Sequence, residues 1–215
     1  MKRIFSLGLA ALMSASLVAA EPATLVWNGA AGDSIWNTQS ANWVEGEIST
    51  PWVEGSVAAI APDSLGAEQR TIVIYDSINV ADFLFDSPQN YTLISATDSV
   101  DKGVHGDFLF VKKGTGTLKL QGQDFWFWPA KGTVIEAGTI EVAGPAAASN
   151  NIEEQVLGPQ VTLKNGATLT FNTNTTDKHG YENIKTDLII EDGAEVTVNF
   201  DRNLVHTGKL VGGKD

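Results

Sequence analysis

Acidic pairs, arginines and histidines are the residues of this chain from which a polysaccharide-cleaving site could be built. Glycoside chemistry needs clustered carboxylates, commonly with a basic residue or Ca²⁺ beside them. The acidic pairs are Glu153-Glu154 and Glu191-Asp192. Asp192 matches Asn165 in an internal repeat described below, so a solvated turn is the favoured interpretation of that pair.

The basic and metal-binding residues do not complete such a site. Arg70 and Arg202 are the only arginines after residue 20, and neither lies in a dense acidic cluster. His105, His179 and His206 share no metal-ligand spacing, and no zinc-protease, nucleophile-elbow or phosphate-loop motif is present. The sequence therefore predicts no catalytic residue, no metal site and no cofactor, and we expect the protein not to be an enzyme.

Four consecutive aromatic residues, Phe125, Trp126, Phe127 and Trp128, are the strongest binding candidates. In an extended segment the two phenylalanines point to one side and the two tryptophans to the other. An outward pair would offer a face on which a sugar ring or a protein partner stacks. The alternative is that both pairs are buried. Pro129 favours a loop or an edge because it lacks an N–H, so we predict that Trp126 and Trp128 make any contact with a surface glycan or protein partner.

These candidates lie among short segments that read as β-strands. Each segment is rich in β-branched or aromatic residues and is bounded by Gly, Pro, Asn, Asp or Ser. They are 71–75, 81–85, 91–94, 108–111, 117–120 and 133–136. No segment after residue 20 carries an apolar stripe with helical spacing, so the predicted class is all-β.

Internal repetition indicates how these strands are arranged. Residues 161–172 align without gaps on residues 188–199, an offset of 27, and both segments read strand, Asn/Asp-Gly turn, strand. The turn glycines are Gly116, Gly138, Gly166 and Gly193. A glycine that recurs every 20 to 30 residues is typical of a solenoid, in which it occupies a corner with positive φ. We therefore predict a parallel β-helix with Gly138, Gly166 and Gly193 stacked in a column. An antiparallel β-sandwich stays open, because Asn-Gly is also a hairpin signal.

The repeat also predicts which side chains face the core. The expected inward residues are Leu118, Leu120, Val134, Ile140, Val142, Leu163, Leu169, Phe171, Ile190, Val196 and Val198. An open stack needs its ends covered. The tryptophan-rich stretch 26–43 is the candidate N-terminal cap.

Residues 112–122 (KKGTGTLKLQG) and 131–142 (KGTVIEAGTIEV) resemble the two halves of the autotransporter-associated β-strand repeat. The opening Trp27-Asn-Gly, with Trp36 and Asn42-Trp43, is similar to the leader that often precedes such repeats. The resemblance implies a right-handed parallel β-helix on the surface of a Gram-negative bacterium, usually within a longer passenger protein linked to adhesion or surface display. The aromatic stretch 124–130 departs from the family, which has a short polar turn there.

The termini and the charge set the expected organisation. Residues 1–20 read as a signal peptide, with Lys2 and Arg3, an apolar stretch and the small residues 18–20 before the cleavage site. We expect a cap at 21–60 and β-helix coils at 61–215, continuing beyond Asp215. The formal net charge is -12 and there is no cysteine. This acidity argues against nucleic acid.

We therefore expect an exported segment, extracellular or at the cell surface, that is structural or adhesive and does not catalyse a reaction. It is expected to be monomeric and not to insert into a membrane. The alternative function is a carbohydrate-binding or polysaccharide-degrading β-helix module.

Overall fold

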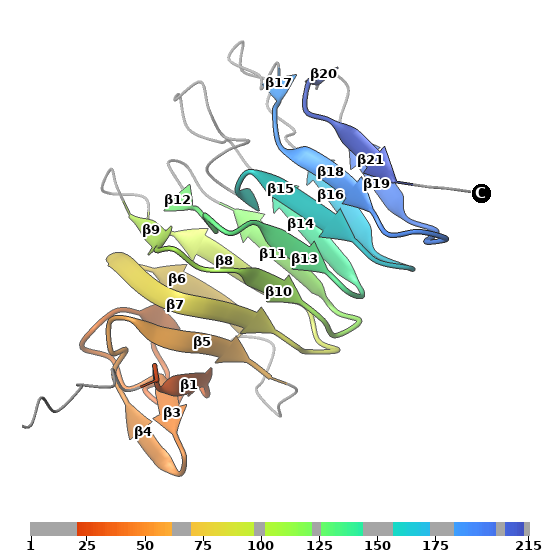
Figure 1. Ribbon diagram of the computed structural model, residues 1–215. Coiled ribbons are helices and arrows are strands. Elements are labelled where there is room, and N and C mark those ends of the chain that lie inside the picture. The colour runs from red at the N-terminus through yellow and green to blue at the C-terminus, as the bar shows by residue number, and fades with distance from the viewer. Residues whose placement is uncertain are drawn as a thin grey trace, which may run out of the picture.

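The computed structural model describes residues 21–61, 70–96, 102–121, 126–143, 157–172, 183–200 and 205–212. The elements in these ranges are β-strands, so the chain is all-β (Figure 1). The strands are β1 (Thr24–Trp27), β2 (Ile35–Trp36), β3 (Trp43–Glu45), β4 (Ile48–Thr50), β5 (Ser56–Ile60), β6 (Thr71–Ile74), β7 (Ser77–Phe85), β8 (Tyr91–Ser95), β9 (Gly103–His105), β10 (Phe110–Lys112), β11 (Thr117–Gln121), β12 (Trp126–Phe127), β13 (Thr133–Ile135), β14 (Thr139–Ala143), β15 (Gln160–Leu163), β16 (Thr168–Asn172), β17 (Asn183–Ile184), β18 (Asp187–Ile190), β19 (Thr197–Phe200), β20 (Val205–His206) and β21 (Leu210–Gly212).

Two long sheets form the body of the protein. Sheet A runs in the order β21-β18-β15-β13-β10-β7-β5-β1-β3-β4, and sheet B in the order β19-β16-β14-β11-β8-β6-β2. The chain alternates between them, and each new strand pairs in parallel with the strand it formed on its previous visit. We call one strand of sheet A with the following strand of sheet B a rung. In the described residues the rungs begin at β5, β7, β10, β13, β15 and β18, and Figure 1 shows them side by side along one axis.

A shorter third face connects sheet B back to sheet A. Residues 77–79 of β7 pair in parallel with β9, β9 pairs with β12, and β17 pairs with β20. Parallel neighbours cannot be joined by a tight hairpin. The chain therefore travels through sheet B and, where these strands exist, through the third face before it returns to sheet A.

Antiparallel pairing is confined, in the described ranges, to β1 with β3 and β3 with β4 at the N-terminal end. The antiparallel β-sandwich that the sequence left open is therefore wrong. β1 itself pairs in parallel with β5, from Thr24 with Val57 to Val26 with Ala59. The first strand of the expected cap thus already belongs to sheet A.

The core lies between the sheets and is lined by every second residue of each strand. Of the expected inward residues, seven are buried: Leu118, Leu120, Ile140, Val142, Leu163, Leu169 and Phe171. Val196 and Val198 are partly buried and pack against the core. The prediction for Val134 is wrong, because Thr133 and Ile135 are the buried residues of β13 and Val134 is only half-buried. Thr133 takes the inward place because its hydroxyl donates to the carbonyl oxygen of Leu157 at 2.9 Å.

Four buried tryptophans fill the N-terminal end of the core: Trp27, Trp36, Trp43 and Trp52. The ring centroids of Trp36 and Trp43 are 4.6 Å apart, and those of Trp43 and Trp52 are 4.9 Å apart. Trp36 also contacts Phe83 of sheet A at 5.8 Å. The tryptophans are thus part of the core and are not available as a ligand platform.

Candidate functional site

The predicted binding aromatics do not form one exposed cluster. Phe127 is fully buried, with its ring centroid 5.0 Å from that of Phe110 and 5.7 Å from those of Phe83 and Phe108. Phe127 as a binding residue is therefore a wrong prediction. The alternation of side chains along β12 directs this ring into the core, where it fills the space between two rungs.

The other three aromatics are placed to different degrees. Phe125 lies outside the described residues. The backbone of Trp126 pairs with Gly103. Trp128 is half-buried, and its N–H donates to the carbonyl oxygen of Val104 at 3.1 Å. Trp128 is thus the one member of the set whose side chain is described and reaches the surface.

The turn glycines occupy the same connection, from sheet A to sheet B, on successive rungs. Gly138, Gly166 and Gly193 have φ values of 70°, 78° and 73°, which glycine adopts without strain. The turns are linked, because the carbonyl oxygen of Gly138 accepts from Thr168 N at 2.9 Å and Gly166 N donates to Glu195 O at 2.8 Å.

Gly116 lies in the corresponding turn of an earlier rung, but its φ is not positive, contrary to the expectation for a corner glycine. A Cβ built on Gly116 would lie 2.1 Å from the carbonyl oxygen of Gln89. Close approach of the neighbouring backbone, rather than a left-handed conformation, therefore requires glycine at this position.

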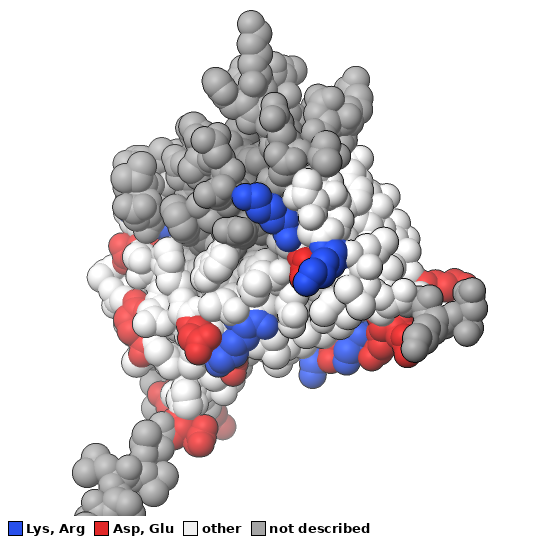
Figure 2. Space-filling model, turned by 45° about the horizontal axis from the view of Figure 1, so that its top comes forward, with Lys and Arg blue, Asp and Glu red and all other residues white. Residues whose placement is uncertain are grey.

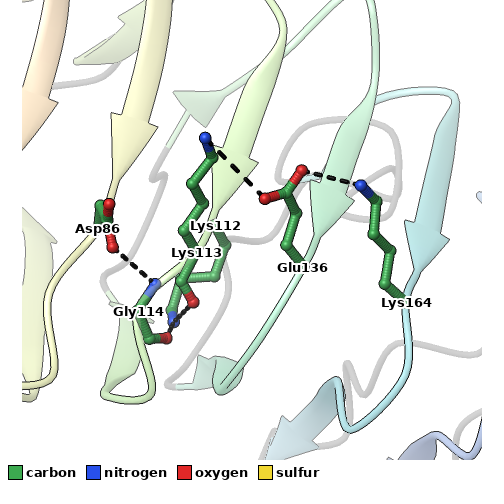
Figure 3. Close-up of polar contacts among 6 residues, drawn as sticks. All are labelled: Asp86, Lys112, Lys113, Gly114, Glu136 and Lys164. Atoms are coloured by element: carbon green, nitrogen blue, oxygen red, sulfur yellow. Dashed lines mark hydrogen bonds and ion pairs between the residues drawn. The ribbon is translucent and has the colours of Figure 1, made fainter.

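A buried lysine lies directly before this turn. Lys112 ends β10, and its side chain is fully buried. Its Nζ donates to the carbonyl oxygens of Ala137 at 3.0 Å, Lys113 at 3.3 Å and Gly114 (Figure 3). It also lies 5.0 Å from the centre of the Phe85 ring. The ammonium group thus joins the turn of its own rung to the turn of the next one.

The electrostatic surroundings of Lys112 oppose one another. Burial lowers the pKa of Lys112 to about 8, while the negative charge of Asp86 raises it. The Asp86 carboxylate also accepts a hydrogen bond of 3.1 Å from Gly114 N. The lysine is enclosed by backbone carbonyls and has no substrate-facing side, so we assign it a structural role.

Charges alternate along the edge formed by these turns. In sheet A, Phe85 pairs with Lys112, Lys112 with Ile135, Ile135 with Leu163 and Leu163 with Ile190. The residues that follow these positions therefore form one column, which reads Asp86, Lys113, Glu136, Lys164 and Glu191. Figure 2 shows basic and acidic side chains in alternation along one edge of the molecule. We call this column the charge ladder.

Glu136 lies at the centre of the charge ladder. Its carboxylate is 4.0 Å from Lys113 Nζ and 2.9 Å from Lys164 Nζ (Figure 3). The hydrogen bond to Glu136 raises the pKa of Lys164. The sequence analysis missed both this ladder and the buried Lys112. The signal available in the sequence was the change of sign at one turn position of each repeat.

The acidic pairs and histidines considered for catalysis do not assemble. Glu191 and Asp192 are exposed in the turn after β18, and His206 Nε2 lies 2.9 Å from the carbonyl oxygen of Thr186. Glu153, Glu154, His179 and Arg202 lie outside the described residues. Within the parts that the structure describes, no group of three or more His, Asp or Glu side chains could hold a metal ion. The same parts contain no helix long and apolar enough to cross a membrane.

Comparison with known proteins finds no family model, no curated protein and no solved structure that matches this chain significantly.

Proposed function

We propose that the chain is a right-handed parallel β-helix that forms a structural or adhesive segment, exported to the surface of a Gram-negative bacterium, without catalytic activity. Residues 1–20 act as the signal peptide in this proposal. The resemblance of residues 112–142 to the autotransporter-associated repeat supports both the handedness and the location.

The observation that carries the proposal is the stacking of the two halves of that repeat. β11 pairs with β14 in parallel through five consecutive residue pairs, from Thr117 with Thr139 to Gln121 with Ala143. β10 pairs with β13 in the same way. The repeat unit in the sequence therefore corresponds to one rung, as expected for a solenoid whose units stabilise each other.

The use of the chemically active side chains also favours a structural role. The carboxylates of Asp82, Asp86 and Asp187 each accept a backbone hydrogen bond from the next rung, at 2.9 Å, 3.1 Å and 2.8 Å. Lys119 lies 3.7 Å from Glu141 on the neighbouring strand of sheet B. These groups hold rungs together and leave no set of acid, base and nucleophile.

A combined assay of location, binding and cleavage tests the proposal. Proteolysis of intact cells should degrade the protein while a cytoplasmic marker survives. Beads coated with the purified protein should adhere to cells or to a glycan surface more than beads coated with heat-denatured protein. No reducing ends or unsaturated products should appear from a panel of acidic and neutral polysaccharides. Protection inside intact cells, or product formation above the denatured control, would contradict the proposal.

Carbohydrate binding is the second candidate, and the position of Trp128 favours it. This indole is half-buried on the third face, next to the buried Phe127. A partly exposed indole can stack on a sugar ring. A screen of immobilised glycans with the wild type and with Trp128→Ala tests this function, because retention by a glycan that the variant loses would support binding through this residue.

A further inference from the structure

The outer face of sheet A carries a continuous apolar column. Leu84, Val111, Val134, Thr162, Ile189 and Val211 occupy the same position on six successive strands, β7, β10, β13, β15, β18 and β21. The first five are half-buried, and Val211 is 50% exposed. Outward positions of a sheet that faces only water are normally polar. This column therefore distinguishes sheet A from sheet B, whose outward positions include Thr117, Lys119, Thr139, Glu141, Thr168 and Thr170.

Charged residues flank the apolar column on both sides. The charge ladder follows it on the side of the turns. On the other side lie Asp82 of β7, Asp187 of β18 and Lys209, which precedes β21. The side-chain oxygens of Asp82 and Asp187 accept backbone hydrogen bonds from neighbouring rungs, whereas Lys209 is exposed.

This pattern is self-complementary when it is read in the reverse order. Consider two copies packed face to face, with their stacking directions opposed and the two-fold axis between β13 and β15. β13 then faces β15 of the second copy, β10 faces β18, and β7 faces β21. Every column faces the same column of the second copy.

Opposite charges meet in this arrangement. Glu136 faces Lys164 of the second copy, Lys113 faces Glu191, and Asp82 faces Lys209. In the apolar column, Leu84 faces Val211 and Val111 faces Ile189. Moving the axis by half a rung, onto β13, would instead bring Lys113 against Lys164 and Asp86 against Glu191, which like-charge repulsion disfavours.

We propose that the outer face of sheet A is a self-association surface on which a second copy of this chain packs in the opposed orientation. Six strands about 4.8 Å apart, with about five residues each, give a face of roughly 500 Å² per copy. A total near 1,000 Å² is at the lower limit of specific interfaces. The dimer is therefore weak and depends on concentration, although the acidic composition by itself favours a monomer.

Sedimentation velocity over a concentration series, up to about 500 µM, tests this surface. The wild type should shift from monomer to dimer. Lys164→Glu should weaken the dimer at least ~10-fold, because it places a carboxylate against Glu136 of the second copy. Lys119→Glu is the matched control, since it breaks a similar Lys–Glu pair on sheet B and should leave the dimer unchanged. The double variant Glu136→Lys, Lys164→Glu should restore association.

A monomer at every concentration would overturn the proposal, as would equal effects of Lys164→Glu and Lys119→Glu. Orientation is tested by cross-linking single cysteines, which the chain otherwise lacks. A cysteine at Gln160, on β15, lies one rung from its mate in the dimer and should be joined by a short bifunctional maleimide. A cysteine at Lys209 lies five rungs from its mate, roughly 24 Å away, and should not be joined. The reverse result would exclude the opposed arrangement.

Discussion

Lys112 and Ala137 belong to successive rungs and are joined by a hydrogen bond of 3.0 Å from the lysine Nζ to the alanine carbonyl oxygen. The donor is a fully buried side chain in a core that is otherwise mostly apolar. A buried ammonium group is tolerated when its protons meet acceptors, and here three backbone carbonyls supply them. This contact fixes one turn on top of another.

Lys112 makes the stability of the fold dependent on pH. Burial lowers its pKa from 10.5 to about 8 in the folded chain. Between these two values the unfolded chain binds more protons than the folded chain, so the free energy of unfolding rises with pH. The rise begins near pH 8, is complete near pH 10.5, and amounts to at most about 3 kcal/mol. Denaturant titrations at pH 7 and pH 10 measure it.

Lys112→Met is the control for the pH effect, because other groups also titrate in this range. The difference in unfolding free energy between wild type and variant should increase from pH 7 to pH 10. At pH 7 the variant should be less stable by about 1–3 kcal/mol, because three carbonyls lose their donor. A difference that stays constant with pH would show that Lys112 does not titrate in this window.

Gly138 and Gly166 should respond differently to substitution by alanine. Both have positive φ, so each alanine variant is strained by about 1 kcal/mol. A Cβ on Gly138 would also lie 2.5 Å from the carbonyl oxygen of Gly114, whereas nothing lies within 4 Å of a Cβ on Gly166. Thermal denaturation should therefore show a clearly larger loss for Gly138→Ala. Equal losses would mean that the neighbouring backbone moves aside.

Phe127 and Trp128 are adjacent but should behave as core and surface. Phe127→Ala removes a fully buried ring and should lower the free energy of unfolding by about 3–5 kcal/mol. Trp128→Ala removes a half-buried ring and should reduce stability much less. Chemical denaturation of the two variants measures the contrast. A large loss for Trp128→Ala would return this residue to the scaffold and count against sugar binding.

Trp27 should tolerate replacement by phenylalanine better than replacement by alanine. The indole nitrogens of Trp27, Trp36, Trp43 and Trp52 have no hydrogen-bond partner in the part of the chain that the structure describes. Trp27→Phe therefore removes no hydrogen bond and leaves a small void, with an expected loss of about 1 kcal/mol, against about 3–5 kcal/mol for Trp27→Ala. Similar losses for the two variants in denaturant titrations would contradict this account.

The strands themselves could be predicted from local patterns. Residues 117–120 and 133–136 alternate in a way that favours strands, and the glycines at 138, 166 and 193 recur with the period of the rungs. Both signals depend on neighbours along the chain. They are therefore visible in a sequence, as were the parallel solenoid reading and most of the inward residues.

Only the tertiary structure decided which side of two segments faces the core. Val134 and Thr133 differ by one position, and a shift of one residue reverses the faces of a strand. The acceptor for the Thr133 hydroxyl, Leu157 O, is supplied by the next turn of the chain. Phe127 is core because Phe83 and Phe110 from earlier rungs leave space for its ring.

The buried Lys112 and the charge ladder show the same division. The sequence by itself determined that charged residues occur at one turn position of each repeat. Their alternation in space depends on the distances between paired strands, which vary from 22 residues between Leu188 and Leu210 to 28 between Val161 and Thr133. Rung lengths differ because connections of different lengths separate the strands, so the column became visible only when the strands were paired.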